Sequence, residues 1–243
     1  MEIHSKSERW NFQPDLVFDC TVVILKQGDD YFFATSERRE TNVNIEDLNS
    51  TRIPTENIFP LYQDTLTKFT NIDNGRDIFV KRPSLNAYKG SDLISRTLLQ
   101  EAQICEQLLA SPHENIAHYR GCKIQHGRII GLCFDKYAET LWERVERGVK
   151  VDESCFRQIS MGVQHLHKLR LIHCDLKDEN IMFRKKDRND LVIIDFDSCV
   201  QHGASLPAKG GPIPNGIDVA DFSIDLCAID RIRSEAVVNG QAE

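Results

Sequence analysis

Apolar residues near the start of the chain gather into short runs that contain β-branched and aromatic residues. Residues 16–25 and 31–35 are two such runs, and the polar stretch 27–30, with its glycine, lies between them. Runs of this kind on both sides of a glycine-containing turn predict a β-hairpin. Residues 38–52 are polar and charged, which predicts a linker or a solvated face. Residues 1–55 are therefore expected to be an N-terminal extension, and no motif in it indicates a function.

The pattern changes after this extension. Residues 65–69 and 77–81 flank an Asn-Gly pair at 74–75, which is a strong hairpin signal. Residues 91–110 predict a helix, because apolar residues recur at every third or fourth position along one face. The apolar run 128–134 predicts a buried strand.

The remaining pattern is mostly helical. Residues 139–147 and 153–169 predict helices, and 218–232 predict a last one. Two short apolar strands, at 181–183 and 191–196, flank a polar turn. Strands followed by helices indicate an α+β fold. We expect a small sheet-rich lobe over residues 56–137 and a helical lobe over 138–243.

Charge and composition narrow the class of protein. The 243 residues include 30 Lys+Arg and 37 Asp+Glu, a net charge of −7, which argues against nucleic acid as a partner. No apolar run is long enough to span a bilayer, and the first twelve residues lack the apolar stretch of a signal peptide. We expect an intracellular, cytoplasmic protein whose eight dispersed cysteines are reduced.

The most informative motif is His-Cys-Asp-Leu-Lys-Asp-Glu-Asn at residues 173–180, followed by Asp-Phe-Asp at 195–197. A short apolar hairpin is predicted between the two parts. This ordered set resembles the catalytic core of the eukaryotic protein-kinase family, whose pattern is H-R-D-L-K-P-E-N followed by D-F-G. Six of the first eight positions match. The resemblance implies a protein kinase-like fold with two lobes.

The resemblance also assigns chemistry to four side chains. Asp175 would orient the acceptor hydroxyl or accept its proton, and Lys177 would contact the transferring phosphate. Asn180 would bind one Mg²⁺ ion and Asp195 the other. Magnesium prefers one or two carboxylates together with phosphate oxygens. ATP and Mg²⁺ are therefore the expected cofactors.

Lys81 ends the sequence Ile-Phe-Val-Lys, which resembles the family's strand with a nucleotide-binding lysine. In the family this lysine pairs with a glutamate on the next helix. Glu101 and Glu106 both lie on the predicted helix. Glu101 shares its face with apolar residues such as Leu98 and Cys105, so it is expected to point inward and to pair with Lys81.

Residues 131–137 resemble the strand and hinge against which adenine stacks in the family. Phe134 would be the bulky residue at the back of the nucleotide pocket. The backbone from Asp135 to Tyr137 would contact the edge of the purine. With Lys81 and Glu101, these residues make up the expected ATP site.

The chain departs from the family pattern in three ways. No glycine-rich loop precedes Lys81, and Tyr-Gln-Asp at 62–64 takes its place, which predicts a more open nucleotide site. Cys174 replaces the arginine that pairs with a phosphorylated loop, and Asp197 replaces a glycine. Asp221 resembles the start of the helix that supports the catalytic loop. The chain ends soon after it, so an incomplete helical lobe is expected.

Three functions follow from these observations. The first is an ATP- and Mg²⁺-dependent protein kinase that acts on Ser/Thr hydroxyls of protein substrates, because Lys177 after Asp175 favours that class over tyrosine kinases. The divergent pattern resembles kinase-like proteins of fungi. The second is a pseudokinase that acts as a binding scaffold, because the glycines and the last helices are missing. The third is a small-molecule phosphotransferase, which shares H-x-D-x(4)-N but is disfavoured by Lys177.

Overall fold

The structure is a computed structural model that describes residues 1–12, 15–70 and 77–239. The chain divides into two compact units. The first contains residues 1–63, 82–99 and 124–131, and the second contains 64–81, 100–123 and 132–243. Both units are discontinuous in sequence, because helix α1 and strands β6 and β7 each contribute residues to both.

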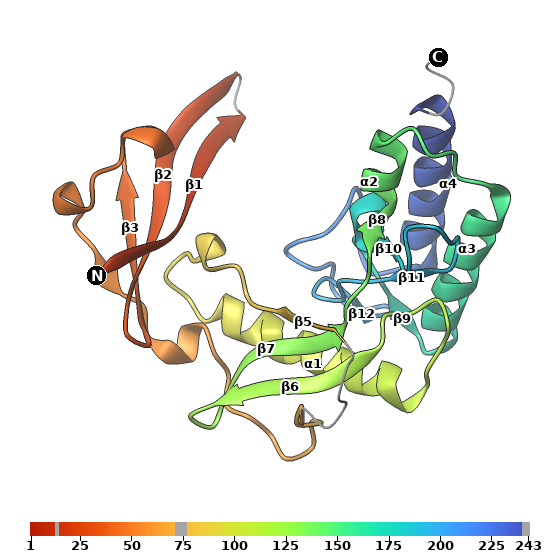
Figure 1. Ribbon diagram of the computed structural model, residues 1–243, viewed down its shortest axis with the longest axis horizontal. Coiled ribbons are helices and arrows are strands. Elements are labelled where there is room, and N and C mark those ends of the chain that lie inside the picture. The colour runs from red at the N-terminus through yellow and green to blue at the C-terminus, as the bar shows by residue number, and fades with distance from the viewer. Residues whose placement is uncertain (13–14, 71–76, 240–243) are drawn as a thin grey trace. The chain divides into compact units, whose positions relative to one another are not determined.

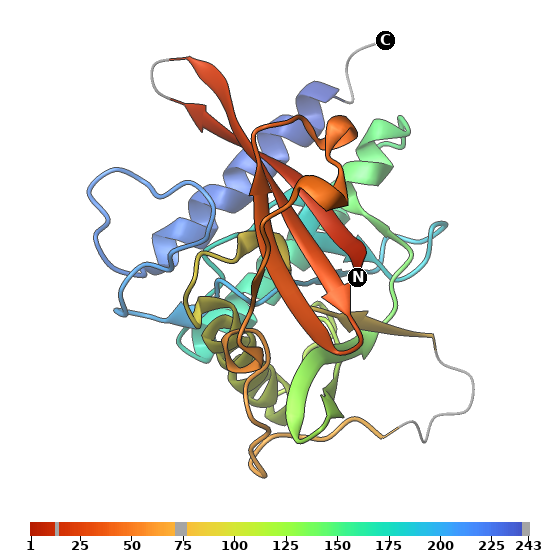
Figure 2. The same cartoon turned by 90° about the vertical axis from the view of Figure 1, so that its left-hand side faces the viewer.

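A four-stranded antiparallel sheet in the order β1-β2-β3-β4 forms most of the first unit. Figures 1 and 2 show its two long strands, β1 (Glu2–Phe12) and β2 (Leu16–Gln27), lying side by side. β3 (Asp30–Ser36) and the short β4 (Thr51–Arg52) complete it. The predicted hairpin is β2–β3. β1 was not predicted, because most of its residues are polar and only its pairing with β2 reveals it as a strand.

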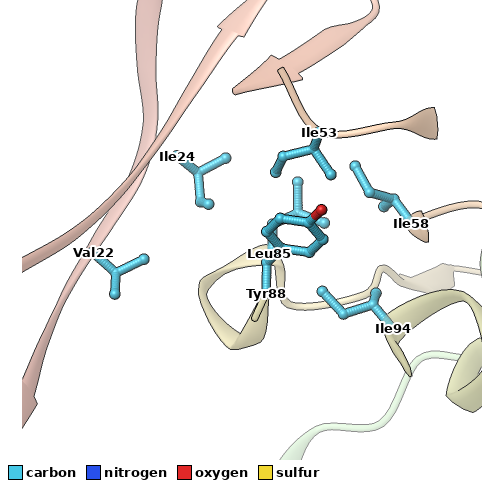
Figure 3. Packing of buried hydrophobic residues seen from close by; sticks show 7 residues of the cluster. All are labelled: Val22, Ile24, Ile53, Ile58, Leu85, Tyr88 and Ile94. Atoms are coloured by element: carbon cyan, nitrogen blue, oxygen red, sulfur yellow. The ribbon is translucent and has the colours of Figure 1, made fainter. Parts of the chain in front are cut away.

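Both faces of this sheet are covered. On one face, the cluster in Figure 3 has the ring of Tyr88 at its centre. Its buried members are Val22, Ile24, Ile53, Ile58, Leu85, Tyr88 and Ile94. On the other face, Val23 and Leu25 pack with apolar residues of the segment 38–52, including Val43 and Leu48. Alternate residues of β2 therefore point to opposite cores. The segment predicted as a linker or solvated face closes one of them.

The buried side chain of Ile24 tests this packing. Ile24→Ala is expected to lower the free energy of unfolding by about 2–5 kcal/mol, because it leaves a cavity between β2 and Tyr88. Leu16→Ala, at an exposed position of the same strand, should cost less than about 0.5 kcal/mol. Urea denaturation of both variants measures the difference. Equal losses would show that this cluster does not stabilise the unit.

A second sheet has the order β5-β7-β6. It consists of β5 (Ile78–Lys81), β6 (Tyr119–Gln125) and β7 (Arg128–Asp135). In the register of β5 on β7, Lys81 lies opposite Leu132. Helix α1 (Leu93–Ala110) precedes β6 in the chain, within the bounds predicted from its apolar face.

The predicted hairpin between residues 65–69 and 77–81 is wrong in its first arm. Residues 65–69 instead run beside β6, where Cys122 N donates to Thr67 O at 2.7 Å and Phe69 N donates to Cys122 O at 2.9 Å. Gly121 permits this approach: its φ is +119°, and a Cβ there would lie 2.7 Å from Phe69 N. The predicted turn at 74–75 lies outside the described residues.

Three helices and several short strands follow in the second unit. The helices are α2 (Leu141–Glu146), α3 (Glu153–Lys168) and α4 (Phe222–Asn239). The short strands are β8 (Glu139–Thr140), β9 (Leu171–Ile172), β10 (Ile181–Phe183), β11 (Leu191–Ile193) and β12 (Val200–Gln201). These elements give the expected α+β fold. No helix in the described part of the chain is both long and apolar enough to cross a membrane.

The ends of these elements differ from the predicted ones for local reasons. α2 begins two residues late because Thr140 caps it: its side chain accepts from Glu143 N, and the Glu143 side chain accepts from Thr140 N. The face of α3 that was predicted to be apolar is buried, and the Asp152 carboxylate caps its start. β11 ends at Ile193, two residues before Asp195 turns the chain at φ +65°.

Candidate active site

Lys81 is the centre of a charged cluster in the second unit. Its Nζ lies 2.6 Å from Glu101 Oε1, 2.6 Å from Asp195 Oδ1 and 3.8 Å from Asp197 Oδ2. The lysine ends β5, Glu101 comes from the middle of α1, and the two aspartates follow β11. Three segments far apart in the sequence therefore meet at one ammonium group.

The structure distinguishes between the two candidate glutamates. Glu101 is 2% exposed, and its Oε1 also accepts from Phe196 N at 3.2 Å. Glu106 instead accepts from Thr67, from its N at 2.7 Å and from its Oγ1 at 2.8 Å. A carboxylate as buried as Glu101 requires a cation, because an unpaired buried charge costs about 3–5 kcal/mol.

The surroundings of Lys81 keep it charged. Burial alone would lower the pKa of Lys81, but the carboxylates of Glu101, Asp195 and Asp197 outweigh burial and raise it above its ordinary value. The ammonium group is therefore a fixed cation throughout the physiological pH range. Lys209 adds a second cation, with its Nζ 2.6 Å from Asp197 Oδ2.

The loop that follows β9 holds three of the predicted residues together. Asn180 Nδ2 donates to Asp175 O at 2.8 Å and to Asp175 Oδ2 at 3.2 Å. Lys177 Nζ lies 3.3 Å from Asp175 Oδ2. A short 3-10 helix, Asp178–Asn180, brings the asparagine back to the aspartate.

Asp225 on α4 fixes this loop, and the sequence interpretation missed it. Its carboxylate is fully buried and accepts from His173 N at 2.9 Å and from Cys174 N at 3.0 Å. It also lies 2.9 Å from His167 Nε2. Asp221 immediately precedes α4, as the sequence indicated, and its carboxylate accepts from Ser223 N at the start of that helix. A carboxylate among apolar residues of a predicted helix was the available signal.

Asp225→Ala tests this support. It leaves the amides of His173 and Cys174 without their acceptor, so we expect a loss of about 3 kcal/mol in the free energy of unfolding. Asp230→Ala, at an exposed position of the same helix, is the matched control and should change stability by less than about 0.5 kcal/mol. Thermal unfolding followed by circular dichroism measures both. A neutral Asp225→Ala would contradict the role of this carboxylate.

Two buried cysteines belong to the site region, Cys174 in the catalytic loop and Cys105 on α1. Cys174 has φ +62°, a conformation that is costly for a residue with a Cβ. Burial, with the nearby carboxylates of Asp225 and Asp175, raises the pKa of Cys174 to about 12. Burial also raises the pKa of Cys105, whose side chain is fully enclosed. The rings of His173 and Phe196 lie 5.7 Å apart. These two thiols are therefore protonated core groups, and no disulfide joins cysteines within the described residues.

The segment after β12 covers Asp175. Gly211 N donates to Cys174 O at 2.8 Å, and a Cβ on Gly210 would lie 2.9 Å from that same oxygen. A Cβ on Gly211 would lie 3.6 Å from Asp175 Oδ1. Asp175 is only 5% exposed as a result of its surroundings. The paired glycines allow the backbone to approach the aspartate closely.

Two oxygens of the site fit the ligand preference of Mg²⁺. Asn180 uses its amide nitrogen on Asp175, and no group within the described residues donates to its Oδ1, which can therefore face a cation. Asp195 uses Oδ1 on Lys81, which leaves Oδ2. One carboxylate and one amide oxygen, completed by phosphate oxygens, suit Mg²⁺. No group of three or more His, Cys, Asp or Glu side chains in the described chain is placed to hold a metal by itself.

The predicted hinge residues lie at the end of β7 and just beyond it. Phe134 is buried, with its ring 5.6 Å from that of Tyr119. The Asp135 carboxylate accepts from Arg120 Nε at 2.6 Å and from Arg120 Nη2 at 3.1 Å. Neither the backbone N–H nor the C=O of Tyr137 has a hydrogen-bond partner among the described residues.

A polar cavity of about 360 Å³ lies beside this segment. Its walls include His113, Arg120, Asp135 and Arg184. Neither Lys81 nor any residue of the catalytic loop lines it. The cavity is therefore separate from the cluster that carries the predicted chemistry.

Comparison with known proteins identifies the family. The model of the protein kinase domain matches residues 65–209, more than half of the chain. The matched range includes the lysine cluster and the loop of Asp175, and it ends at Lys209. This chain belongs to the protein kinase family, whose fold it shares.

Several proteins of fungi are similar to this chain in sequence. The chain is 30% identical over 140 residues to the serine/threonine-protein kinase/endoribonuclease IRE1 of Hypocrea jecorina, which covers 52% of this chain and 10% of that protein. It is 31% identical over 124 residues to the sensor for unfolded proteins in the ER ire1 of Schizosaccharomyces pombe, covering 47% and 10%. It is 28% identical over 144 residues to the serine/threonine-protein kinase PSK1 of Saccharomyces cerevisiae, an alignment that covers 52% of this chain and 9% of that protein. The chain thus spans about a tenth of the length of these relatives.

Proposed function

We propose that this chain is a serine/threonine protein kinase that transfers a phosphoryl group from ATP, with Mg²⁺, to hydroxyls of protein substrates. The observation that carries the proposal is the meeting of Lys81 with Glu101 and Asp195 at 2.6 Å each. Phosphoryl transfer depends mainly on positioning and on charge stabilisation. A half-buried lysine fixed between two carboxylates supplies both.

Each side chain then has a defined task. Lys81, held by Glu101, offers its ammonium group to phosphate oxygens. Asn180 and Asp195 would hold Mg²⁺, which supplies the positive charge that offsets charge on the transferring group. Asp175, oriented by Asn180, positions the acceptor hydroxyl and takes its proton. Lys177, beside Asp175, stabilises the phosphate during transfer.

The named relatives support this class over a small-molecule phosphotransferase. Two of the three are called serine/threonine-protein kinases, and the matched family model is that of the protein kinase domain. The unbonded backbone of Tyr137 supports an ATP site, because adenine requires free hydrogen-bonding groups at the hinge. The side chains of Phe134 and Asp135 lie at the end of the same strand.

A second candidate, a pseudokinase that acts as a binding scaffold, is favoured by the cover over Asp175. Gly211 N donates a hydrogen bond to Cys174 O, and Lys209 forms an ion pair with the Asp197 carboxylate. A hydroxyl can reach Asp175 only if this segment moves. The absence of a glycine-rich loop before Lys81 also favours weak ATP binding.

Transfer from labelled Mg-ATP to a generic protein substrate distinguishes the two. Asp175→Asn is expected to lower the rate by about 10²–10⁴-fold, because it removes the general base. Lys81→Met should lower it by at least about 100-fold, because the fixed cation is lost. Lys89→Met, at an exposed lysine of the first unit, should leave the rate unchanged.

Circular dichroism establishes whether each variant is folded, since Lys81→Met leaves Glu101 unpaired. Wild-type protein that binds Mg-ATP in a thermal-shift assay without any transfer would support the scaffold. A rate unchanged by Asp175→Asn would contradict the kinase proposal.

Lys209→Met tests the cover. Its ammonium group pairs with Asp197 and places a positive charge near Asp195, where it repels a metal cation. We therefore expect the Mg²⁺ concentration for half-maximal thermal stabilisation by a non-hydrolysable ATP analogue to fall. The lysine side chain is 62% exposed, so the expected change is modest, about two- to fivefold. Lys150→Met, another exposed lysine, is the control. A higher Mg²⁺ requirement in Lys209→Met would show that Lys209 helps to hold the nucleotide complex.

A further inference from the structure

The first unit contains a cavity of about 330 Å³ that no part of the proposed catalytic site lines. Its walls come from the β2–β3 hairpin, from Phe59, from residues 82–85 and from residues 125–130. The extension that gave no functional signal in the sequence thus supplies one side of a built cavity. Ligand pockets are commonly about 300–1,000 Å³, so this one suits a single large side chain.

The cavity carries an excess of positive charge. Lys26, Arg82 and Arg128 all line it, and none has a carboxylate partner among the residues that the structure describes. The one acidic residue in the lining, Asp29, is already engaged, 3.5 Å from His126 Nε2 and 3.4 Å from Gln125 Nε2. In a chain of net charge −7, three unpaired cations around one cavity indicate an anionic ligand.

Most of the remaining lining is aromatic or aliphatic. The rings of Tyr31 and Phe59 lie 6.1 Å apart in an edge-to-face contact, and Leu85 and Ile130 are buried beside them. Lys26 Nζ lies 5.8 Å from the centre of the Tyr31 ring. Arg128 Nη1 donates to Phe59 O at 2.7 Å, which fixes this guanidinium against the apolar wall. The lining therefore favours a ligand with an apolar group inside the cavity and negative charges beside the three cations.

We propose that this cavity binds an acidic peptide segment of a partner protein, with one aromatic side chain inserted into the cavity against Tyr31 and Phe59. Edge-to-face contacts stabilise such an insertion. The cations come from separate segments of the chain, so they suit carboxylates spaced on both sides of the aromatic residue. No glycine-rich turn of backbone amides lines the cavity, in contrast to sites built for a phosphate group.

Fluorescence anisotropy with a fluorescein-labelled peptide, Asp-Glu-Phe-Glu-Asp, tests the proposal on the full chain. The charge-reversal variants Lys26→Glu and Arg82→Glu should each weaken binding by at least about tenfold. Lys89→Glu, an exposed lysine of the same unit outside the cavity, should bind as the wild type does. The peptide Asp-Glu-Ala-Glu-Asp should bind about tenfold more weakly, because it lacks the anchor.

Several results would overturn the proposal. No saturable binding at about 1 mM peptide would exclude a specific site. Equal affinity of the phenylalanine and alanine peptides would show that charge attraction alone holds the peptide and that no aromatic side chain is inserted. Tighter binding of AMP, or of phosphatidylserine vesicles, lost in Arg82→Glu but kept in Lys89→Glu, would assign the cavity to a nucleotide or a lipid surface. Circular dichroism of each variant confirms that a loss of binding is not a loss of fold.

Discussion

The need to neutralise the buried carboxylate of Glu101 constrains the second unit most strongly. Glu101 lies in the interior of α1, where an unpaired charge would be strongly destabilising. Lys81 meets this need and brings the end of β5 to the helix. The same ammonium group then fixes Asp195, and Glu101 also accepts from Phe196 N. One ion pair therefore orders a strand, a helix and the segment that carries the metal-binding candidate.

A second buried carboxylate, that of Asp225, also fixes a segment of the candidate site. Asp225 lies on α4 and accepts from two successive amides of the catalytic loop. Those amides precede Asp175, so the loop is fixed while Cys174 keeps its left-handed conformation. In both cases a buried carboxylate on a helix accepts hydrogen bonds from backbone N–H groups of a loop, and the loop gains a fixed geometry.

Two features of the segment after β12 distinguish this candidate site from the family pattern. The carboxylate of Asp197 stands where the family has glycine, and Lys209 pairs with it. Gly210 and Gly211 let the following backbone lie against Asp175. The charge and the shape of the covering segment are thus matched to the residues that it covers.

Prediction from sequence succeeded where a local pattern decides the outcome. The apolar face of α3, the hairpin β2–β3 and the ordered motif of the kinase family could all be recognised in that way. It failed where a distant partner decides. Residues 65–69 lie beside β6 because Gly121 admits them, and β1 is a strand because β2 pairs with it. Neither partner can be identified from a local window.

The sequence by itself determined the family and the residue types of the candidate site, because the motif places those types at fixed spacings. Only the tertiary structure decided which groups meet. Glu101 rather than Glu106 reaches Lys81, and Asp225 rather than Asp221 holds the loop. Both residues of each pair are acidic; Glu101 and Glu106 lie on α1, and Asp225 lies on α4 while Asp221 immediately precedes it. Direction and burial distinguish them, and those are fixed only when the chain has folded.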